Sequence, residues 1–292
     1  MITKIQSETG ESIRAISRTL SLPRSSHYHA GKPTKRALED HRLGELIETI
    51  FREHRRRYGY RRIHQELKDH NIKCSPERVR RIMKARNLRA LSRRRFTPKT
   101  SDGKAPVPAP NLLKERAQPV RPNEVWTGDI TYLPSANGWL YLAIVIDLYS
   151  RRIIGWYVAD HMRTELVLTA LNQAIETRSR TSGSQPIFHS DRGSQYGSTS
   201  LRETLQRANI DQSMSAKANP YDNAWTESFM GTLKTELLSD GQFETIADAR
   251  ATLFEYIEAY YNTKRKHSSL GYRTPHQAEL NSQFLTLPLL TN

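Results

Sequence analysis

Apolar residues recur with helical spacing at the start of the chain. Ile13, Ile16 and Leu20 stand at positions i, i+3 and i+7, which lie on one face of a helix. The segment Ser21-Leu22-Pro23 ends this pattern, and Pro23 can occupy the first position of a second short helix. A helix, a tight turn and a second helix form the outline of a helix-turn-helix, so we interpret residues 1–38 as such a domain.

Three more amphipathic patterns follow. The first places apolar residues at Leu43, Ile47, Ile50 and Phe51, and the next at Ile63 and Leu67. The third begins at Ser75-Pro76, where serine can cap a helix and proline can take its first position. We interpret residues 39–92 as a second helix-turn-helix-like domain.

The pattern changes near Val125, where short apolar runs alternate with helical segments. We expect strands at 125–132, 140–148, 151–158, 186–191 and 210–214, and helices at 164–178, 200–208, 224–238 and 244–261. This order predicts an α/β domain over residues 123–283. The tryptophans Trp126, Trp139 and Trp156 are interpreted as core residues of that domain.

A proline-rich segment separates the two regions. Six of the 14 prolines lie between Pro98 and Pro122, and such segments are extended and semi-rigid. We therefore interpret residues 93–122 as a linker. At the other end, residues 284–292 form an apolar tail, which we interpret as a docking segment for a partner subunit.

Charge is distributed unevenly along the 292 residues. Residues 1–120 hold 29 Lys and Arg against 12 Asp and Glu, whereas residues 121–292 hold 16 against 18, and the whole chain carries +15. This asymmetry predicts a nucleic-acid-binding front end on a separate C-terminal domain. The candidate DNA contacts are Arg24, Arg61, Arg62, Arg78, Arg81, Arg93, Arg94, Arg95, Lys264, Arg265 and Lys266.

Composition excludes several classes of protein. The only cysteine is Cys74, which excludes an internal disulfide framework and a cysteine-rich zinc module. The longest apolar stretch is far shorter than the roughly 20 residues of a transmembrane helix, and the first residues lack the apolar core of a signal peptide. We expect a soluble, cytoplasmic chain with no membrane partner.

Three acids stand out in the expected α/β domain. Asp129 lies in the first strand, Asp191 ends the fourth, and Glu227 opens a helix after 35 intervening residues. Carboxylates that converge repel each other unless a cation lies between them. Hard oxygen ligands of this kind suit Mg²⁺ or Mn²⁺, and two such ions serve phosphodiester chemistry. Asp147, at the end of the second strand, competes as a ligand, but we assign it a structural role in the turn that follows.

The residues around these acids resemble those of a known family. Trp126-x-x-Asp129-Ile130-Thr131-Tyr132, His189-Ser190-Asp191-Arg192-Gly193-Ser194-Gln195-Tyr196 and Asn223-Ala224-x-x-Glu227-Ser228-Phe229 are similar to motifs of the OrfB-type transposases of bacterial insertion sequences. Tyr58-Gly59-Tyr60 in the front end and the residues from Tyr261-Asn262 to Thr274-Pro275 fit the same family. One departure is Gly128, where a residue with greater strand propensity is expected.

The resemblance implies a fold and a reaction. The fold would be the RNase H-like, retroviral-integrase-like core, preceded by all-α helix-turn-helix DNA-binding domains. Asp129, Asp191 and Glu227 would hold two Mg²⁺ ions, with Mn²⁺ able to substitute, for DNA strand cleavage and strand transfer. Lys234, two helical turns beyond Glu227, matches a basic residue of the family and would hold a DNA phosphate.

The resemblance also implies partners. These would be the terminal inverted repeats of an insertion sequence, target DNA, at least one more copy of the chain, and an upstream OrfA-type protein joined by frameshifting. Two other interpretations stay open at this point. One is a metal-dependent nuclease that only hydrolyses DNA, and the other is a DNA-binding regulator with an inactive core.

Overall fold

The computed structural model describes residues 2–24, 33–92, 109–114, 116–178, 185–215, 224–238 and 241–285. The chain divides into two compact units, Met1–Ala90 and Leu91–Asn292. Each unit is described separately below. The finer domain boundaries expected from the sequence stay predictions.

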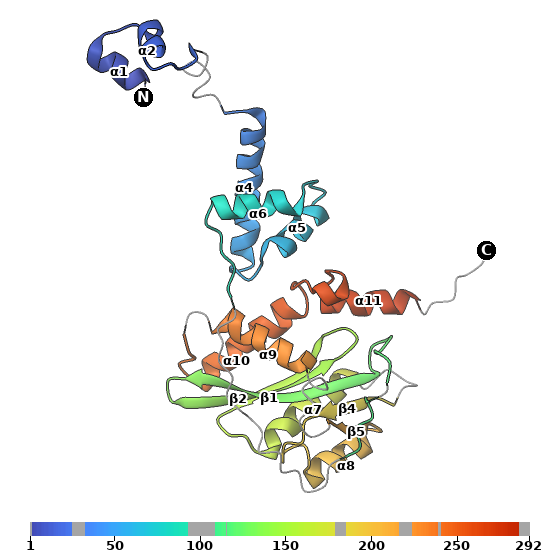
Figure 1. The fold of residues 1–292 in the computed structure, drawn as a ribbon. Helices are drawn as coiled ribbons and strands as arrows, with labels where there is room; N and C mark the ends of the chain where they lie inside the picture. The colour runs from blue at the N-terminus through green and yellow to red at the C-terminus, as the bar shows by residue number, and fades with distance from the viewer. Residues whose placement is uncertain are drawn as a thin grey trace, which may run out of the picture. The chain divides into compact units, whose positions relative to one another are not determined.

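The described part of the first unit is helical (Figure 1). Its helices are α1 (Ile2–Thr9), α2 (Ile13–Thr19), α4 (Lys35–Glu53), α5 (Tyr60–Asp69) and α6 (Pro76–Ala85). Three of them begin at a hydroxyl cap: Ser12, Thr34 and Ser75 accept hydrogen bonds from the backbone N–H groups three residues on. Such caps satisfy donors that a helix leaves open at its start.

The predicted amphipathic stripes form the core of α4, α5 and α6. Ile47, Ile63, Leu67 and Val79 are fully buried there. Helices α2, α4, α5 and α6 are therefore confirmed, while α1 was not expected. The second helix predicted after Pro23 falls mostly on residues 25–32, outside the described residues.

The second unit is built on a five-stranded sheet. Its strands are β1 (Val125–Ser135), β2 (Gly138–Asp147), β3 (Ile153–Ala159), β4 (Ile187–Ser190) and β5 (Asp211–Met214). The strand order is β3-β2-β1-β4-β5. Strands β1, β2 and β3 pair antiparallel, whereas β4 runs parallel to both β1 and β5. All five expected strands are confirmed, and the sheet is mixed.

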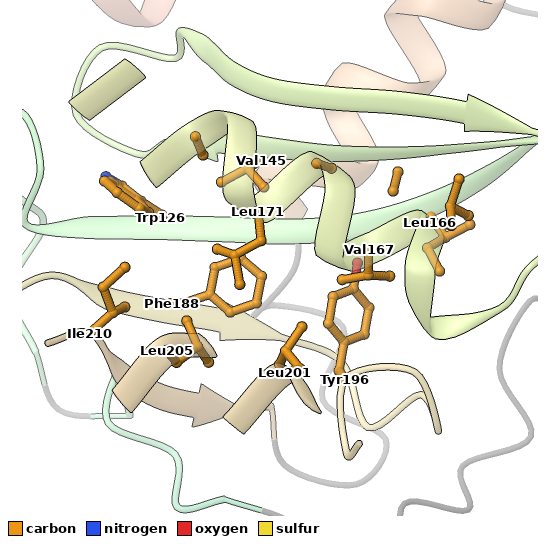
Figure 2. Packing of buried hydrophobic residues seen from close by; sticks show 14 of the residues in the cluster. Trp126, Val145, Leu166, Val167, Leu171, Phe188, Tyr196, Leu201, Leu205 and Ile210 are labelled. Carbon is orange, nitrogen blue, oxygen red and sulfur yellow. The ribbon is translucent and has the colours of Figure 1, made fainter. Parts of the chain in front are cut away.

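Helices cover both faces of this sheet (Figure 1). They are α7 (Thr164–Arg178), α8 (Thr199–Arg207), α9 (Ala224–Leu237), α10 (Ile246–Phe254) and α11 (Pro275–Leu285). Side chains of α7 and α8 pack with those of β1, β2 and β4 in one apolar cluster on one face, as Figure 2 shows for Leu171, Leu205 and Phe188. Helices α9 and α10 contact the sheet from its other face. The α/β fold class with a helical front end is thus confirmed.

Side chains of β1 alternate between the two faces. Trp126 and Ile130 belong to the apolar cluster with α7 and α8. Thr127 points the other way, because its hydroxyl is hydrogen-bonded to Thr226 of α9. Successive side chains of a strand face opposite sides, so Asp129 shares the α9 face with Thr127.

One helix expected at residues 244–261 has two parts. The α-helix α10 continues as a π-helix over Glu255–Tyr261. Asn262 follows it, and its side-chain amide both accepts a hydrogen bond from the backbone N–H of Ile153 and donates one to the carbonyl of Ile153. The wider π turn places Asn262 against the first residue of β3, a contact that helical periodicity does not indicate.

Among the tryptophans, the expectation for Trp139 was wrong. Trp126 is 2% exposed, but Trp139, which lies near the hairpin end of β2, is 50% exposed. In the described part of the chain, no helix is long and apolar enough to cross a membrane.

Candidate active site

Asp129 lies midway along β1 on the α9 face of the sheet. Asp129 is partly buried, and its Oδ1 atom accepts a hydrogen bond of 2.8 Å from the backbone N–H of Ile130. The central position of β1 in the sheet holds this carboxyl group between β2 and β4.

Asp191 follows β4, the parallel neighbour of β1. The last parallel pair of β1 and β4 joins Thr127 to His189, and Asp129 and Asp191 each follow that pair by two residues. Oδ1 of Asp191 accepts a hydrogen bond of 2.9 Å from the backbone N–H of Gly193, directly after the strand. The negative charge of Asp191 contributes to the raised pKa of Asp129, so the two carboxyl groups interact.

Glu227 stands in the first turn of α9 and its side chain is exposed. The helix meets β1 next to this residue, where the hydroxyl of Thr226 donates to that of Thr127 over 3.1 Å. The segment directly before the helix, residues 216–223, lies outside the described residues.

The carboxyl groups influence each other electrostatically. Burial raises the pKa of Asp129 to about 7, and the negative charges of Asp191 and Glu227 contribute to this rise. The hydrogen bond from Ile130 and the charge of Lys234 oppose it. The three acids predicted from the sequence therefore lie in one electrostatic environment, although they come from three elements.

Their present arrangement is not that of a closed metal site. Within the described ranges, no group of three or more His, Cys, Asp and Glu side chains is arranged to hold an ion.

Lys234 of α9 interacts electrostatically with Asp129. Burial lowers the pKa of Lys234, while the charge of Asp129 opposes that effect. The residue is half-buried. Its role as a contact for a DNA phosphate stays a prediction.

Tyr196 is a residue of this environment that sequence reasoning did not single out. Its side chain is buried in the apolar cluster (Figure 2), and its hydroxyl has no hydrogen-bond partner in the described structure. Burial raises the pKa of Tyr196 well above its usual range, with contributions from Asp129 and Asp191. Its place in the Asp191 motif was the only signal available in the sequence.

The absence of a side chain at Gly128 leaves space for the rings of Tyr196 and Phe188. A Cβ atom at Gly128 would lie 2.5 Å from Phe188 and 3.3 Å from Tyr196. The unexpected glycine before Asp129 is therefore a packing requirement of the face opposite to Asp129.

Asp147 has the structural surroundings expected of it. It is fully buried, and its carboxylate accepts hydrogen bonds from the backbone N–H groups of Asn123, Tyr149 and Ser150. Burial raises the pKa of Asp147, and these hydrogen bonds oppose the rise. His189, fully buried, shares a hydrogen bond of 2.8 Å with the hydroxyl of Ser213.

The basic residues of the first unit have different surroundings. Arg24 and Arg61 are exposed, and Arg62 is half-buried, with its guanidinium 5.6 Å from the ring centre of Tyr58. Arg78 and Arg81 both form ion pairs with Asp40, at 2.6 and 2.7 Å, and so join α6 to α4. Arg93, Arg94 and Arg95 lie outside the described residues.

The expected basic patch at residues 264–266 requires a correction. Lys264 is exposed, but Arg265 and Lys266 are buried. The guanidinium of Arg265 donates to both carboxylate oxygens of Glu236, with the closest contact at 2.7 Å. A buried carboxylate needs such a partner, so Arg265 joins α9 to the segment after the π-helix instead of facing DNA.

Known protein families match most of the chain. An integrase core domain family matches residues 119–220, a second family of the same description matches residues 208–275, and an HTH-like domain family matches residues 37–96. Among solved structures, the HTLV-2 integrase catalytic core domain in complex with magnesium matches with 18% identity and a TM-score of 0.42, over 55% of this chain and 98% of that one.

Two curated relatives are similar over nearly their whole length. The transposase for insertion sequence element IS904 of Lactococcus lactis is 42% identical over 249 residues, or 85% of this chain and 97% of the relative. Transposase InsF for IS3A of Escherichia coli is 37% identical over 273 residues, or 92% and 94%. The chain therefore belongs to the insertion-sequence transposases that carry an integrase core domain, a family whose members act on DNA.

Proposed function

We propose that Asp129, Asp191 and Glu227 hold two Mg²⁺ ions and that this site carries out DNA strand cleavage and strand transfer. The observation that carries the proposal is the placement of the three acids around the middle of the sheet. Asp129 lies in β1, Asp191 directly follows the adjacent strand β4, and Glu227 lies in the first turn of α9, which is hydrogen-bonded to β1. Carboxylates that act on each other's charge are stabilised when a cation enters between them.

The donor set fits a hard divalent cation. All three groups are carboxylates, the ligand type that Mg²⁺ and Mn²⁺ prefer. Asp129 lies in β1 and Asp191 directly follows the adjacent strand β4, whereas Glu227 is exposed in the first turn of a helix. An exposed glutamate can reorient its side chain toward the other two at little cost.

The chemistry divides between the ions and the protein. Bound divalent ions would supply Lewis-acid stabilisation of charge on the attacking and leaving oxygens. The strands hold Asp129 and Asp191 in place. Lys234, half-buried near Asp129, would bind a DNA phosphate next to the reacting bond and orient it.

The first unit would supply most of the affinity for DNA. Its exposed cations include Arg24 and Arg61, and phosphate contacts of this kind dominate DNA affinity. Joining two element ends to one target requires at least two copies of the chain. Fusion to an upstream OrfA-type protein stays a prediction.

A strand-joining assay tests the reaction. The full chain is incubated with Mg²⁺, target DNA and a duplex that carries an element end already cut to a 3′-hydroxyl. We expect this hydroxyl to be joined to the target, and Mn²⁺ to replace Mg²⁺. Hydrolysis of DNA without any joined product would instead favour the nuclease interpretation, and no metal-dependent reaction at all would overturn the proposal.

A further inference from the structure

We propose that Thr127, Arg151, Trp225 and Thr226 form an anchor that sets the position of Glu227 in the metal site. We call these four residues the α9 anchor. They are positioning residues, because none of them supplies a metal ligand. The inference rests on the proposed function of Glu227 and adds to it a cause for the placement of that side chain.

The first contact of the anchor joins the helix to the central strand. The hydroxyl groups of Thr226 and Thr127 are hydrogen-bonded at 3.1 Å, and both residues are fully buried. Thr226 immediately precedes Glu227, and Thr127 stands two positions before Asp129 on the same face of β1. One hydrogen bond therefore sets the register between the two elements that carry Glu227 and Asp129.

The second contact is made by Trp225, the residue before Thr226 in the same helical turn. The guanidinium of Arg151 lies 3.7 Å from the ring centre of Trp225, within the range of a strong cation–π contact. The Nε and Nη1 atoms of Arg151 are buried without a hydrogen-bond partner in the described structure. The indole face is thus an important partner for this cation, and the pairing accounts for a tryptophan that is 37% exposed.

Arg151 is itself held by the turn between β2 and β3. Its backbone N–H donates to the carbonyl of Asp147 over 2.8 Å, and its φ of 62° lies in the left-handed region. The carboxylate of Asp147 binds the N–H groups of Tyr149 and Ser150 in the same turn. The turn between β2 and β3 therefore sets the position of Arg151 against Trp225.

Both contacts are made by the two residues that directly precede Glu227 in the first turn of α9. The exposed Glu227 side chain can reorient, so the position of its backbone on β1 decides whether the carboxyl group reaches the other two acids. Residues that orient a metal ligand typically change metal affinity by about 10–100-fold when they are replaced. Loss of the anchor should therefore weaken metal binding without removing a ligand.

The threonine contact is tested by direct Mn²⁺ binding to the full chain, measured by titration calorimetry. We expect Thr226→Val to weaken Mn²⁺ binding by about tenfold and Thr226→Ser, which keeps the hydroxyl, to restore it. Binding to a DNA element end should be the same in all three proteins. Wild-type Mn²⁺ affinity in a folded Thr226→Val protein would overturn the proposal.

A double variant separates positioning from stability. Thr226→Val alone takes the donor from the buried Thr127 hydroxyl, whereas Thr127→Val combined with Thr226→Val removes both polar groups, which is nearly neutral for stability. We expect the double variant to regain the wild-type melting temperature but to bind Mn²⁺ as weakly as Thr226→Val alone. Recovery of both properties together would assign the pair to stability alone and contradict the anchor.

The cation–π contact is tested with a matched pair of tryptophans. Trp225→Leu should weaken Mn²⁺ binding by about fivefold or more, and Trp225→Phe, which keeps an aromatic face, should lose less. Trp139→Leu, at an exposed tryptophan near the hairpin end of β2, should leave the affinity unchanged. Equal effects of Trp225→Leu and Trp139→Leu would overturn this contact.

The wild-type titration separates failure of the anchor from failure of the proposed function. If the wild-type chain binds no Mn²⁺ and Glu227→Gln changes nothing, the metal site is wrong and the anchor falls with it. If the wild-type chain binds Mn²⁺, Glu227→Gln abolishes that binding and the anchor variants keep the wild-type affinity, then the metal site is right and the anchor is wrong.

Discussion

At the scale of single residues, the site contains Asp129, whose carboxyl group has a raised pKa, next to Gly128, which leaves space for two aromatic rings. Asp129 faces α9, and Gly128 beside it faces Phe188 and Tyr196. The alternation of a strand puts these two requirements on opposite faces. Asp129 therefore serves the candidate site, while the adjacent Gly128 serves the packing of the opposite face.

The raised pKa of Asp129 predicts a pH dependence of stability. A pKa raised from 3.8 to about 7 in the folded state contributes stability below pH 3.8 that is lost as the pH rises toward 7. In metal-free buffer, Asp129→Asn should match the wild type near pH 4 and exceed it by about 2 kcal/mol near pH 8, a value reduced for partial exposure. Urea unfolding at both pH values measures the difference.

Asp160→Asn is the control for this prediction, because Asp160 is exposed at the end of β3. Its unfolding free energy should follow the wild type at both pH values. A constant difference between Asp129→Asn and wild type from pH 4 to pH 8 would show that the Asp129 carboxyl group ionises normally.

The close packing around Gly128 predicts that a larger residue at this position destabilises the fold. Gly128→Ala brings a Cβ atom to 2.5 Å from Phe188, and overpacking of this kind costs about 2 kcal/mol. Combining it with Phe188→Leu should recover part of that loss, so the two substitutions should be non-additive in thermal unfolding. Simple additivity would contradict the close approach.

At the scale of elements, the second unit is joined by buried polar pairs between segments far apart in the sequence. Arg265 and Glu236 are 29 positions apart and both nearly fully buried. Glu279 of α11 is contacted by Ser150, Arg152 and Arg178. These pairs hold α9 and α11 in place on the sheet.

The Arg265 pair predicts a loss of stability instead of a loss of DNA affinity. Arg265→Met leaves the Glu236 carboxylate buried without this cation, which costs about 3–5 kcal/mol. Lys264→Met, at the exposed neighbour, should leave the unfolding free energy unchanged. If Arg265→Met is as stable as wild type and binds DNA more weakly, Arg265 is a DNA contact after all.

The elements of the core could be predicted because each has a strong local pattern. Helix α7 has the bounds expected from its apolar spacing, and β1 was recognised from its β-branched and aromatic residues. The π-helix could not be predicted, since its hydrogen-bond shift leaves no mark in apolar periodicity. The pairing of Arg265 with Glu236 also depends on tertiary packing, so the sequence pattern suggested a surface patch there.

The candidate site was only partly predictable for the same reason. The positions of Asp129, Asp191 and Glu227 follow from motifs and spacing. The partners Thr127, Trp225 and Thr226 do not, because threonine and tryptophan at these positions carry no spacing signal.

At the scale of the whole molecule, most of the positive charge and the candidate catalytic acids lie in different units. Residues 1–90 hold 22 Lys and Arg against 10 Asp and Glu, whereas residues 91–292 hold 23 against 20. The first unit therefore carries most of the charge that attracts a polyanion, and the second unit, which is nearly neutral, carries the carboxylates that attract cations. This separation allows affinity and reaction to be changed independently.

The separation predicts where the salt dependence of DNA binding arises. Affinity for an element end should fall steeply with salt, because each neutralised phosphate releases counterions. Arg80→Ala, at an exposed position of α6, should lower the salt slope by about one. Arg163→Ala, an exposed cation of the second unit, should leave the slope unchanged, and the reverse result would place the phosphate contacts in that unit.

The most direct test of the account is the reaction of Glu227→Gln beside Asp147→Asn, measured as cleavage and joining of element ends together with end binding. Glu227→Gln keeps the shape of the side chain and removes one negative charge. It should abolish both reactions and leave binding nearly intact, because the metal ligands stabilise transition-state charge and the first unit supplies affinity. Asp147→Asn should retain measurable activity in folded protein. Full activity of Glu227→Gln, with activity abolished in well-folded Asp147→Asn, would contradict the assignment.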